Sequence, residues 1–192
     1  MTNIILASSS VYRIEQLQKL NINFVAVAPT IDEEPLKLKK LDHTELSVKL
    51  ALLKARSISK DNDNTIVIAG DQVASFGDTL LSKPKTKENA FKQLKTLSGK
   101  EHRLITSLAI IFNDQEYIHT CVATMKMRQL TDEKIRRYID IDAPLQCCGS
   151  YKIECLGISL FDTIDCEDYT SIIGIPLMWT AKTLSKLGVS VP

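Results

Sequence analysis

Short segments of consecutive or alternating apolar residues, bounded by polar and turn-forming residues, run along the chain. Such segments are typical of strands that are buried on one or both faces. The expected strands are residues 3–7, 23–28, 65–69, 103–112 and 116–127. Only Asn113-Asp114-Gln115 separates the last two segments, which predicts an antiparallel hairpin.

Between these segments, apolar residues recur with the period of an amphipathic helix. A hydroxyl residue, able to accept a hydrogen bond from the first helical turn, precedes most of these stretches. The expected N-caps are Ser10, Thr44, Thr86 and Thr131. A last helix is expected to have Pro176 in its first turn and Gly188 just past its end. Helices and strands that interleave around an antiparallel hairpin predict an α/β fold with a mixed sheet.

The chain has 192 residues and no internal repeat or low-complexity linker. We therefore expect a single domain over residues 1–192, with room for two lobes around a cleft. No apolar run approaches the roughly 20 residues of a spanning helix. No basic stretch precedes an apolar segment at the start of the chain, as it would in a secretory signal. We expect a cytoplasmic protein that does not cross a membrane.

The net charge and the cysteine spacing disfavour several classes of protein and kinds of site. The 24 Lys and Arg residues nearly balance the 23 Asp and Glu residues, which leaves a net charge of +1. This balance disfavours a nucleic-acid coat and a membrane-surface protein. The five cysteines include no Cys-x-x-Cys spacing, and the three histidines lie far apart. We expect free, buried thiols rather than a zinc site or a disulfide framework.

The first candidate for chemistry follows the first expected strand. Ser8-Ser9-Ser10 leads into a helix that carries Arg13 in its first turn. Free backbone N–H groups and the positive end of the helix dipole suit a phosphate group there, and Arg13 adds a fork of donors. The alternative is a well-capped helix with a solvated arginine.

Two acidic segments are the next candidates. Asp32-Glu33-Glu34 offers hard oxygen ligands for a divalent cation, or is simply a solvated acidic loop. Asp71 follows Gly70 at the carboxyl end of a buried strand, where α/β sheets place ligands. Such a carboxylate can hold a metal ion or take a proton from water. The alternative is an aspartate that caps a loop.

Two lysines complete the set. Lys83 precedes Pro84, which favours extended backbone, and Lys54 lies beside the apolar face of the second expected helix. Each ammonium group can bind a phosphate as a point charge. For each lysine the alternative is a solvated surface position.

In this order, these segments resemble the Maf family of nucleotide pyrophosphatases over nearly the full chain. The motifs that carry the resemblance are Leu6-Ala7-Ser8-x-Ser10-x-x-Arg13, Asp32-Glu33, Lys54-Ala55, Gly70-Asp71, Lys83-Pro84, Ser98-Gly99, Gly149-Ser150-Tyr151 and residues 173–177. The resemblance implies hydrolysis of nucleoside triphosphates to the monophosphate and diphosphate, with Mg²⁺ or Mn²⁺. It also implies a homodimer, and an elongated mixed α/β sheet with flanking helices and a central cleft, shared with the house-cleaning triphosphatases.

The resemblance assigns roles by position. Ser8, Arg13, Lys54 and Lys83 would bind the substrate. Asp71 would be the catalytic acidic residue and would hold the metal ion together with Glu33. His102 matches a common family histidine but is left outside the catalytic set. Cys148 is interpreted as a packing residue, while the role of Cys147 stays open.

Three further positions indicate which nucleobase the substrate carries. Tyr12, Gln72 and Glu154 look like the family branch that acts on 7-methyl-GTP, whereas the pyrimidine branch usually has Arg, Thr and Gln there. Methylation at N7 makes guanine a cation, which an aromatic face attracts. The Glu154 carboxylate would accept hydrogen bonds from the guanine N1–H and amino groups. The expected reaction converts 7-methyl-GTP to 7-methyl-GMP and diphosphate, a removal of modified nucleotides.

Three alternatives stay open at this point. One is a pyrophosphatase of the same family that acts on dTTP and UTP. The second is a nucleotide-sensing regulator of cell division and septum formation. The third is an RNA-binding domain, which the charge balance and the 6 % aromatic content disfavour.

Overall fold

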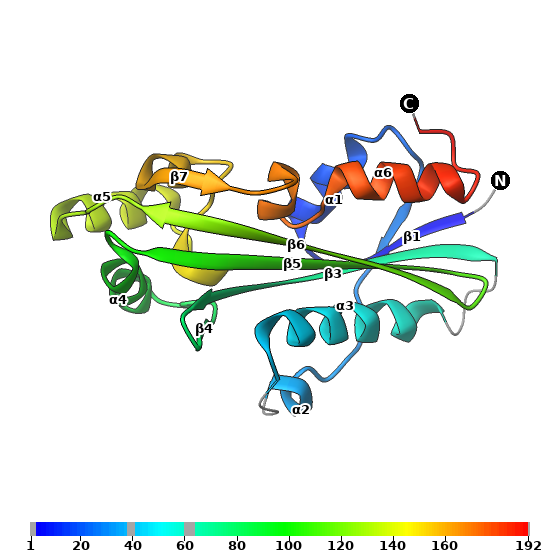
Figure 1. Cartoon of the computed structure of the whole chain (residues 1–192), viewed down its shortest axis with the longest axis horizontal. Helices are drawn as coiled ribbons and strands as arrows, with labels where there is room; N and C mark the ends of the chain where they lie inside the picture. The colour runs from blue at the N-terminus through cyan, green and yellow to red at the C-terminus, as the bar shows by residue number, and fades with distance from the viewer. Residues whose placement is uncertain (1–2, 38–40, 60–63, 192) are drawn as a thin grey trace. The chain divides into compact units, whose positions relative to one another are not determined.

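A seven-stranded mixed sheet carries the fold (Figure 1). The computed structural model describes residues 3–37, 41–59 and 64–191. The strands are β1 Asn3–Ala7, β2 Val25–Val27, β3 Thr65–Phe76, β4 Thr79–Leu81, β5 Glu101–Phe112, β6 Gln115–Met127 and β7 Phe161–Asp165. The sheet order is β2-β1-β3-β5-β6-β7, and β4 pairs with β3 outside this path.

Helices flank the sheet. They are α1 Val11–Gln18, α2 Glu34–Lys37, α3 His43–Ser59, α4 Lys87–Leu97, α5 Asp132–Asp142 and α6 Leu177–Lys186. Three short 3₁₀ helices follow α5: η1 Cys148–Ser150, η2 Leu156–Leu160 and η3 Tyr169–Ile172. Strand β1 runs parallel to both β2 and β3, while β4 and β7 are antiparallel to their neighbours. The predicted mixed α/β class is confirmed.

The chain divides into two compact units, which are described separately below. Unit 1 comprises Met1–Gln72, Thr106–Cys121 and Asp168–Pro192, and unit 2 comprises Val73–Ile105 and Val122–Glu167. Strands β3, β5 and β6 each contain residues of both units.

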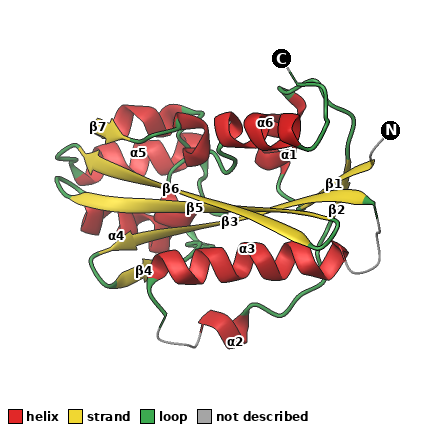
Figure 2. Ribbon diagram, turned by 45° about the vertical axis from the view of Figure 1, so that its right-hand side comes forward, coloured by secondary structure: helices red, strands yellow, loops and turns green. Residues whose placement is uncertain are grey.

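Unit 1 has three layers, because side chains of a strand alternate between its two faces. Ile66 and Ile68 of β3 pack with residues of α1 and α6, such as Leu17 and Leu184. Val67 and Ala69 face the other way and pack with residues of α3. Figures 1 and 2 show α3 on one side of the sheet and α1 and α6 on the other. The buried residues from α3 in this layer are Ala51 and Ala55, whose small side chains let the helix approach the sheet closely.

Unit 2 contains α4, α5, η1, η2, β4 and β7. Helix α4 packs against α5 and η1, and α5 packs against η2. The ion pairs Lys87–Asp140 and Lys95–Asp132 join α4 to α5 on the exposed side. Their apolar sides bury residues such as Leu94 and Ile139.

Most of the helix caps and turns that local sequence patterns predicted are present in the structure. Thr86 and Thr131 cap α4 and α5 through their side chains. Ser10 occupies the N-cap of α1, but its side chain makes no capping hydrogen bond. Asn113 and Asp114 both have positive φ, as the two-residue hairpin turn between β5 and β6 requires.

Four expectations need correction. The predicted cap Thr44 lies inside α3, and Asp42 caps this helix by accepting hydrogen bonds from the N–H groups of Thr44 and Glu45. Pro176 is the N-cap of α6 rather than a residue of its first turn. Strand β3 runs on to Phe76, and the short strands β4 and β7 were not predicted.

None of the described helices is both long and apolar enough to span a membrane.

Candidate active site

The candidate site lies where β1 has ended and β3 continues. The register pairs β1 with β3 as far as Leu6 and Ile68, and β4 pairs with β3 only from Ala74 onward. Residues 70–73 therefore have no partner in either of these two strands. The segment Gly70-Asp71-Gln72 is part of this stretch, so Asp71 lies within the long strand β3 and not at its end as expected.

Strand alternation sends Asp71 to the same face as Val67 and Ala69, toward α3. There its Oδ1 lies 2.5 Å from Lys54 Nζ. The same ammonium lies 3.0 Å from Glu33 Oε1. Only 12 % of the Lys54 side chain and 10 % of the Asp71 side chain are exposed, so this cluster is largely shielded from solvent.

Helix α3 presents Lys54 because Ser47, Ala51, Lys54 and Ala55 share one helical face. Ala51 and Ala55 fill the contact with the sheet. One turn before Ala51, the Ser47 hydroxyl donates to the backbone oxygen of Asp71 over 3.2 Å. This bond ties α3 to the stretch of β3 between its β1 and β4 pairings, a contact that the sequence analysis did not predict.

The structure separates the three carboxylates that the sequence left equivalent. Asp32 Oδ1 accepts from the N–H of Glu34, so this side chain caps the start of α2. Glu34 is exposed in the first turn of α2. Glu33 alone of the three pairs with Lys54 among the described contacts.

Arg13 approaches β3 from the opposite face. Its Nε donates to the backbone oxygen of Gly174 over 3.2 Å. A Cβ atom built on Gly70 would lie 3.5 Å from the same nitrogen, and one built on Gly174 would lie 3.2 Å from it. The contact at Gly174 is too close for an ordinary side chain unless the arginine shifts, whereas the distance at Gly70 is that of a normal van der Waals contact. Gly174 also has a φ of +140°, which other residues rarely adopt.

The other predicted residues at the start of α1 lie close by in sequence. Ser8 is buried, and its hydroxyl accepts from the N–H of Ser10. Tyr12 is half-buried in the first turn of α1. The turn between β1 and α1 is thus held by Ser8 rather than by the expected cap, Ser10.

Gln72 faces the side of α1 and α6, as alternation requires. Its Nε2 lies 2.9 Å from Thr106 Oγ1, 3.1 Å from the Ser171 oxygen and 2.9 Å from the Ile172 oxygen. The amide nitrogen therefore fixes η3 against β3 and β5. Gln16 of α1 adds a second hold on η3 by donating to the Thr170 oxygen over 2.7 Å.

Lys83 and Glu154 belong to unit 2 and share a neighbourhood there. Burial, the larger cause, and the Glu154 charge together raise the pKa of the Cys147 thiol to about 11. Lys152 and Lys83 act on the same thiol in the opposite direction. Both predicted residues of unit 2 are thus close enough to Cys147 to change its charge balance.

His102, left outside the catalytic set, is a core residue of unit 2. It is 3 % exposed, and burial lowers its pKa to about 4. Its Nε2 lies 3.0 Å from the Tyr151 hydroxyl, and its ring packs against Tyr151 and Phe161. The neutral imidazole is a packing and hydrogen-bonding group in this position.

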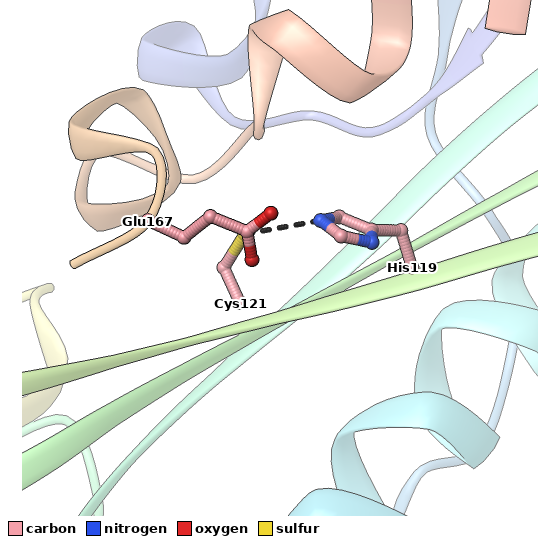
Figure 3. Close-up of side chains that lie close together, drawn as sticks. All are labelled: His119, Cys121 and Glu167. Carbon is pink, nitrogen blue, oxygen red and sulfur yellow. Dashed lines mark hydrogen bonds between the residues drawn. The ribbon is translucent and has the colours of Figure 1, made fainter.

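All five cysteines are free, but the expectation that they are buried holds only for Cys121. Cys155 is exposed, and the remaining three are half-buried. In unit 1, the Cys121 sulfur lies 3.3 Å from His119 Nε2 (Figure 3). The His119 ring also stacks on Trp179 of α6, with ring centres 5.2 Å apart. Figure 3 also draws Glu167, a residue of unit 2.

Comparison with known proteins decides the family. The model of the family described as Maf-like protein matches residues 3–187. The chain belongs to the Maf family. The resemblance inferred from the ordered motifs is thereby confirmed.

Curated relatives of this Maf protein are similar over nearly their whole length. A protein of Bdellovibrio bacteriovorus named 7-methyl-GTP pyrophosphatase is 42 % identical over 94 % of this chain and 95 % of its own. Another 7-methyl-GTP pyrophosphatase, from Pseudomonas aeruginosa, is 39 % identical over the full length of both chains. A nucleoside triphosphate pyrophosphatase of Acinetobacter baylyi is 39 % identical over 100 % of this chain and 98 % of its own. The structure of a HAM1 protein from Coxiella burnetii matches 66 % of this chain and 73 % of its own, at 19 % identity and a TM-score of 0.46.

The carboxylates of this Maf protein fit a divalent cation. Oxygens of Glu33 and Asp71 converge on one positive group, the Lys54 ammonium. Hard carboxylate oxygens are also the donors that Mg²⁺ and Mn²⁺ prefer. A metal ion in this cluster would share these oxygens with Lys54.

Proposed function

We propose that this Maf protein is a nucleoside triphosphate pyrophosphatase that hydrolyses 7-methyl-GTP to 7-methyl-GMP and diphosphate. The observation that carries the proposal is the partly buried Glu33–Lys54–Asp71 cluster, which lies beside the stretch of β3 between its β1 and β4 pairings. Family membership and the names of the full-length relatives support the same reaction.

In the proposed reaction, Asp71 accepts a proton from a water molecule. At the same time the oxygen of this water molecule attacks the α-phosphorus. The bond between this phosphorus and the oxygen that bridges to the β-phosphorus breaks, and diphosphate leaves with that oxygen and its electron pair. A carboxylate with a well-defined position suits this role because proton transfer depends on geometry. The Lys54 ammonium holds the Asp71 carboxylate in place and adds positive charge near the reacting phosphate.

The other cationic groups would neutralise the remaining negative charge of the triphosphate. Arg13 and the Ser8 turn at the N-terminal end of α1 would bind phosphate oxygens, and Lys83 would contribute a further point charge. Mg²⁺ or Mn²⁺, held by Asp71 and Glu33, would neutralise phosphate charge and make water more acidic. These residues then act mainly by positioning and electrostatics.

For the base, we propose that the Tyr12 ring lies against the methylated guanine and that Glu154 accepts its hydrogen bonds. Cation–π attraction is worth about 0.5–2 kcal/mol and favours the charged 7-methylguanine ring. Gln72 was predicted to act in specificity as well, and its three contacts indicate that it would do so by positioning η3. Cytoplasmic location and a homodimer, which the family resemblance implies, belong to the same proposal.

A nucleotide panel tests the proposal. Purified protein is incubated with 7-methyl-GTP, GTP, dTTP and UTP in the presence of Mn²⁺ or Mg²⁺, and the products are separated by ion-exchange chromatography. We expect monophosphate and diphosphate, with the highest kcat/KM for 7-methyl-GTP. Preference for dTTP and UTP would support the pyrimidine alternative, and binding without turnover would support the nucleotide-sensing alternative; either result would contradict the proposal.

A further inference from the structure

Lys83 lies on a short loop of unit 2 whose backbone is held from both sides by α4. The carbonyl oxygen of Ser82 accepts from Gln93 Nε2 over 2.8 Å. The carbonyl oxygen of Pro84 accepts from Asn89 Nδ2 over 3.0 Å. Asn89 and Gln93 are four positions apart, so they project from the same face of α4. The backbone on each side of Lys83 is therefore fixed, while the lysine itself remains exposed.

The other end of the Gln93 amide reaches a different part of unit 2. Its Oε1 accepts from the Ser150 hydroxyl over 2.6 Å. Ser150 is fully buried and has a φ of +65°, so both its hydroxyl and its backbone depend on their surroundings. It belongs to the turn Gly149-Ser150-Tyr151, which precedes Glu154.

One further hydrogen bond and one electrostatic effect support this connection between the loop and the turn. The N–H of Lys85 donates to the Leu145 oxygen over 3.0 Å, which brings the Lys83 loop to the segment before Cys147. The charges of Lys83 and Glu154 both act on the Cys147 thiol. The Gln93 carboxamide thus bridges the two segments of unit 2 that carry the predicted phosphate-binding and base-binding residues.

We infer that Gln93 is a positioning residue of this pyrophosphatase, which sets Lys83 through the Ser82 carbonyl and Glu154 through the Ser150 hydroxyl. The inference rests on the proposed function, because it assumes that Lys83 and Glu154 bind the nucleotide. Gln93 itself does not touch the substrate. Its two ends act on separate properties: the amide nitrogen on triphosphate affinity, and the amide oxygen on base selectivity.

Substitutions can separate the two ends. Gln93→Ala removes both hydrogen bonds, and we expect the KM for 7-methyl-GTP to rise about tenfold, the size of one hydrogen bond. The kcat should change less than about threefold, because the reacting groups lie on α3 and β3. The preference for 7-methyl-GTP over GTP should fall at the same time.

Gln93→Glu retains an acceptor for Ser150 but cannot donate to the Ser82 oxygen. It should raise the KM for both nucleotides and keep the preference for 7-methyl-GTP. Ser150→Gly suits the positive φ and removes the side chain with its hydroxyl, so it should weaken the preference without a general rise in KM. Lys92→Ala, an exposed neighbour on the same helix, is the matched control and should behave as wild type.

Steady-state kinetics with both nucleotides, together with thermal melting of each variant, test the inference. If Gln93→Ala changes neither KM nor preference, or only lowers the melting temperature, Gln93 is structural and the inference is wrong. Lys83→Ala distinguishes this failure from a failure of the proposed function. If the proposed function is wrong, the wild type releases no diphosphate, or the Lys83→Ala variant has the same KM as the wild type.

Discussion

At the scale of single residues, the surroundings of a side chain decide its chemistry more than its type does. Lys54 and Lys83 looked alike in sequence. In the structure, Lys54 is nearly buried between two carboxylates, whereas Lys83 is exposed on a fixed loop. Burying a charge is costly unless it is paired, so the Lys54 cluster must be a specific, well-positioned arrangement.

Asp71→Asn tests this cluster directly. The amide oxygen can still accept from Lys54, so we expect the variant to fold, but it cannot take a proton from water. Turnover should fall by on the order of 10²- to 10⁴-fold, the usual contribution of a general base. Diphosphate release measures turnover, and circular dichroism and thermal melting check folding. A rate within about tenfold of wild type would remove Asp71 from the catalytic role.

His102 leads to a prediction about acid stability. Its pKa is lowered from 6.5 to about 4 by burial, so the unfolded chain takes up a proton at a higher pH than the folded protein does. The free energy of unfolding should therefore fall as the pH drops from about 6.5 toward 4, by up to about 3 kcal/mol for a shift of this size.

Urea unfolding at pH 7 and pH 5 measures this loss. His102→Gln keeps a donor for the Tyr151 hydroxyl but does not titrate, so its stability should depend less on pH than that of the wild type. An equally steep dependence in the variant would assign the acid sensitivity to other groups.

At the scale of elements, the alternation of β3 organises the site. Asp71 faces α3 and meets Lys54, while Gly70 and Gln72 face α1, α6 and η3, where they meet Arg13 and the carbonyl groups of η3. A shift of one residue in the register of β3 would exchange these two sets of groups. The β-branched residues 66–68, which contribute to both core layers, therefore fix the register on which the site depends.

Gly174→Ala tests how η3 and the residues after it position Arg13. The added methyl group would lie 3.2 Å from the Arg13 side chain at a φ of +140°, so the arginine must move. We expect the KM for 7-methyl-GTP to rise about tenfold, as for the loss of one charged hydrogen bond. Gly188→Ala is the matched control. Gly188 also has positive φ, but its added methyl group meets no atom within 4 Å.

The control separates backbone strain from displacement of the arginine. Both variants should lose stability, by about 1 kcal/mol for an alanine forced to positive φ. Only Gly174→Ala should change the KM. If both variants keep the KM of the wild type, the contact of Arg13 with Gly174 has no bearing on substrate binding.

At the scale of the whole molecule, periodic signals were readable from the sequence and aperiodic ones were not. The hairpin, the helix caps Thr86 and Thr131, and the mixed sheet follow from local patterns. The sequence pattern did not predict strands β4 and β7, because a short strand shows almost no periodicity of apolar residues.

The polar contacts that hold the site escaped prediction for a different reason. Gln72 contacts Ser171, which is 99 residues away, and Gln93 contacts Ser150, which is 57 residues away. A lone glutamine gives no sequence signal for such a distant partner. Of the site, motif order indicated Glu33, Lys54 and Asp71, which the structure joins in one cluster. The roles of Lys83 and Glu154 in substrate binding remain predictions.

The last prediction concerns the choice of nucleobase, which we propose depends on Tyr12 and Glu154. Tyr12 lies in the first turn of α1 and Glu154 follows η1, so the two residues come from different elements. We expect Tyr12→Arg combined with Glu154→Gln to reduce kcat/KM for 7-methyl-GTP relative to UTP. An arginine repels the methylated base, and a glutamine lacks the negative charge that complements it.

Competition between 7-methyl-GTP and UTP in one reaction measures the preference without depending on enzyme concentration. Arg136→Ala, on the exposed side of α5, controls for a general effect of surface charge and should leave the ratio unchanged. Attraction between a cationic base and an aromatic ring contributes about 0.5–2 kcal/mol, so the double variant should shift the ratio by at least about twofold. An unchanged ratio would mean that these two residues do not recognise the base, even if the pyrophosphatase activity itself is present.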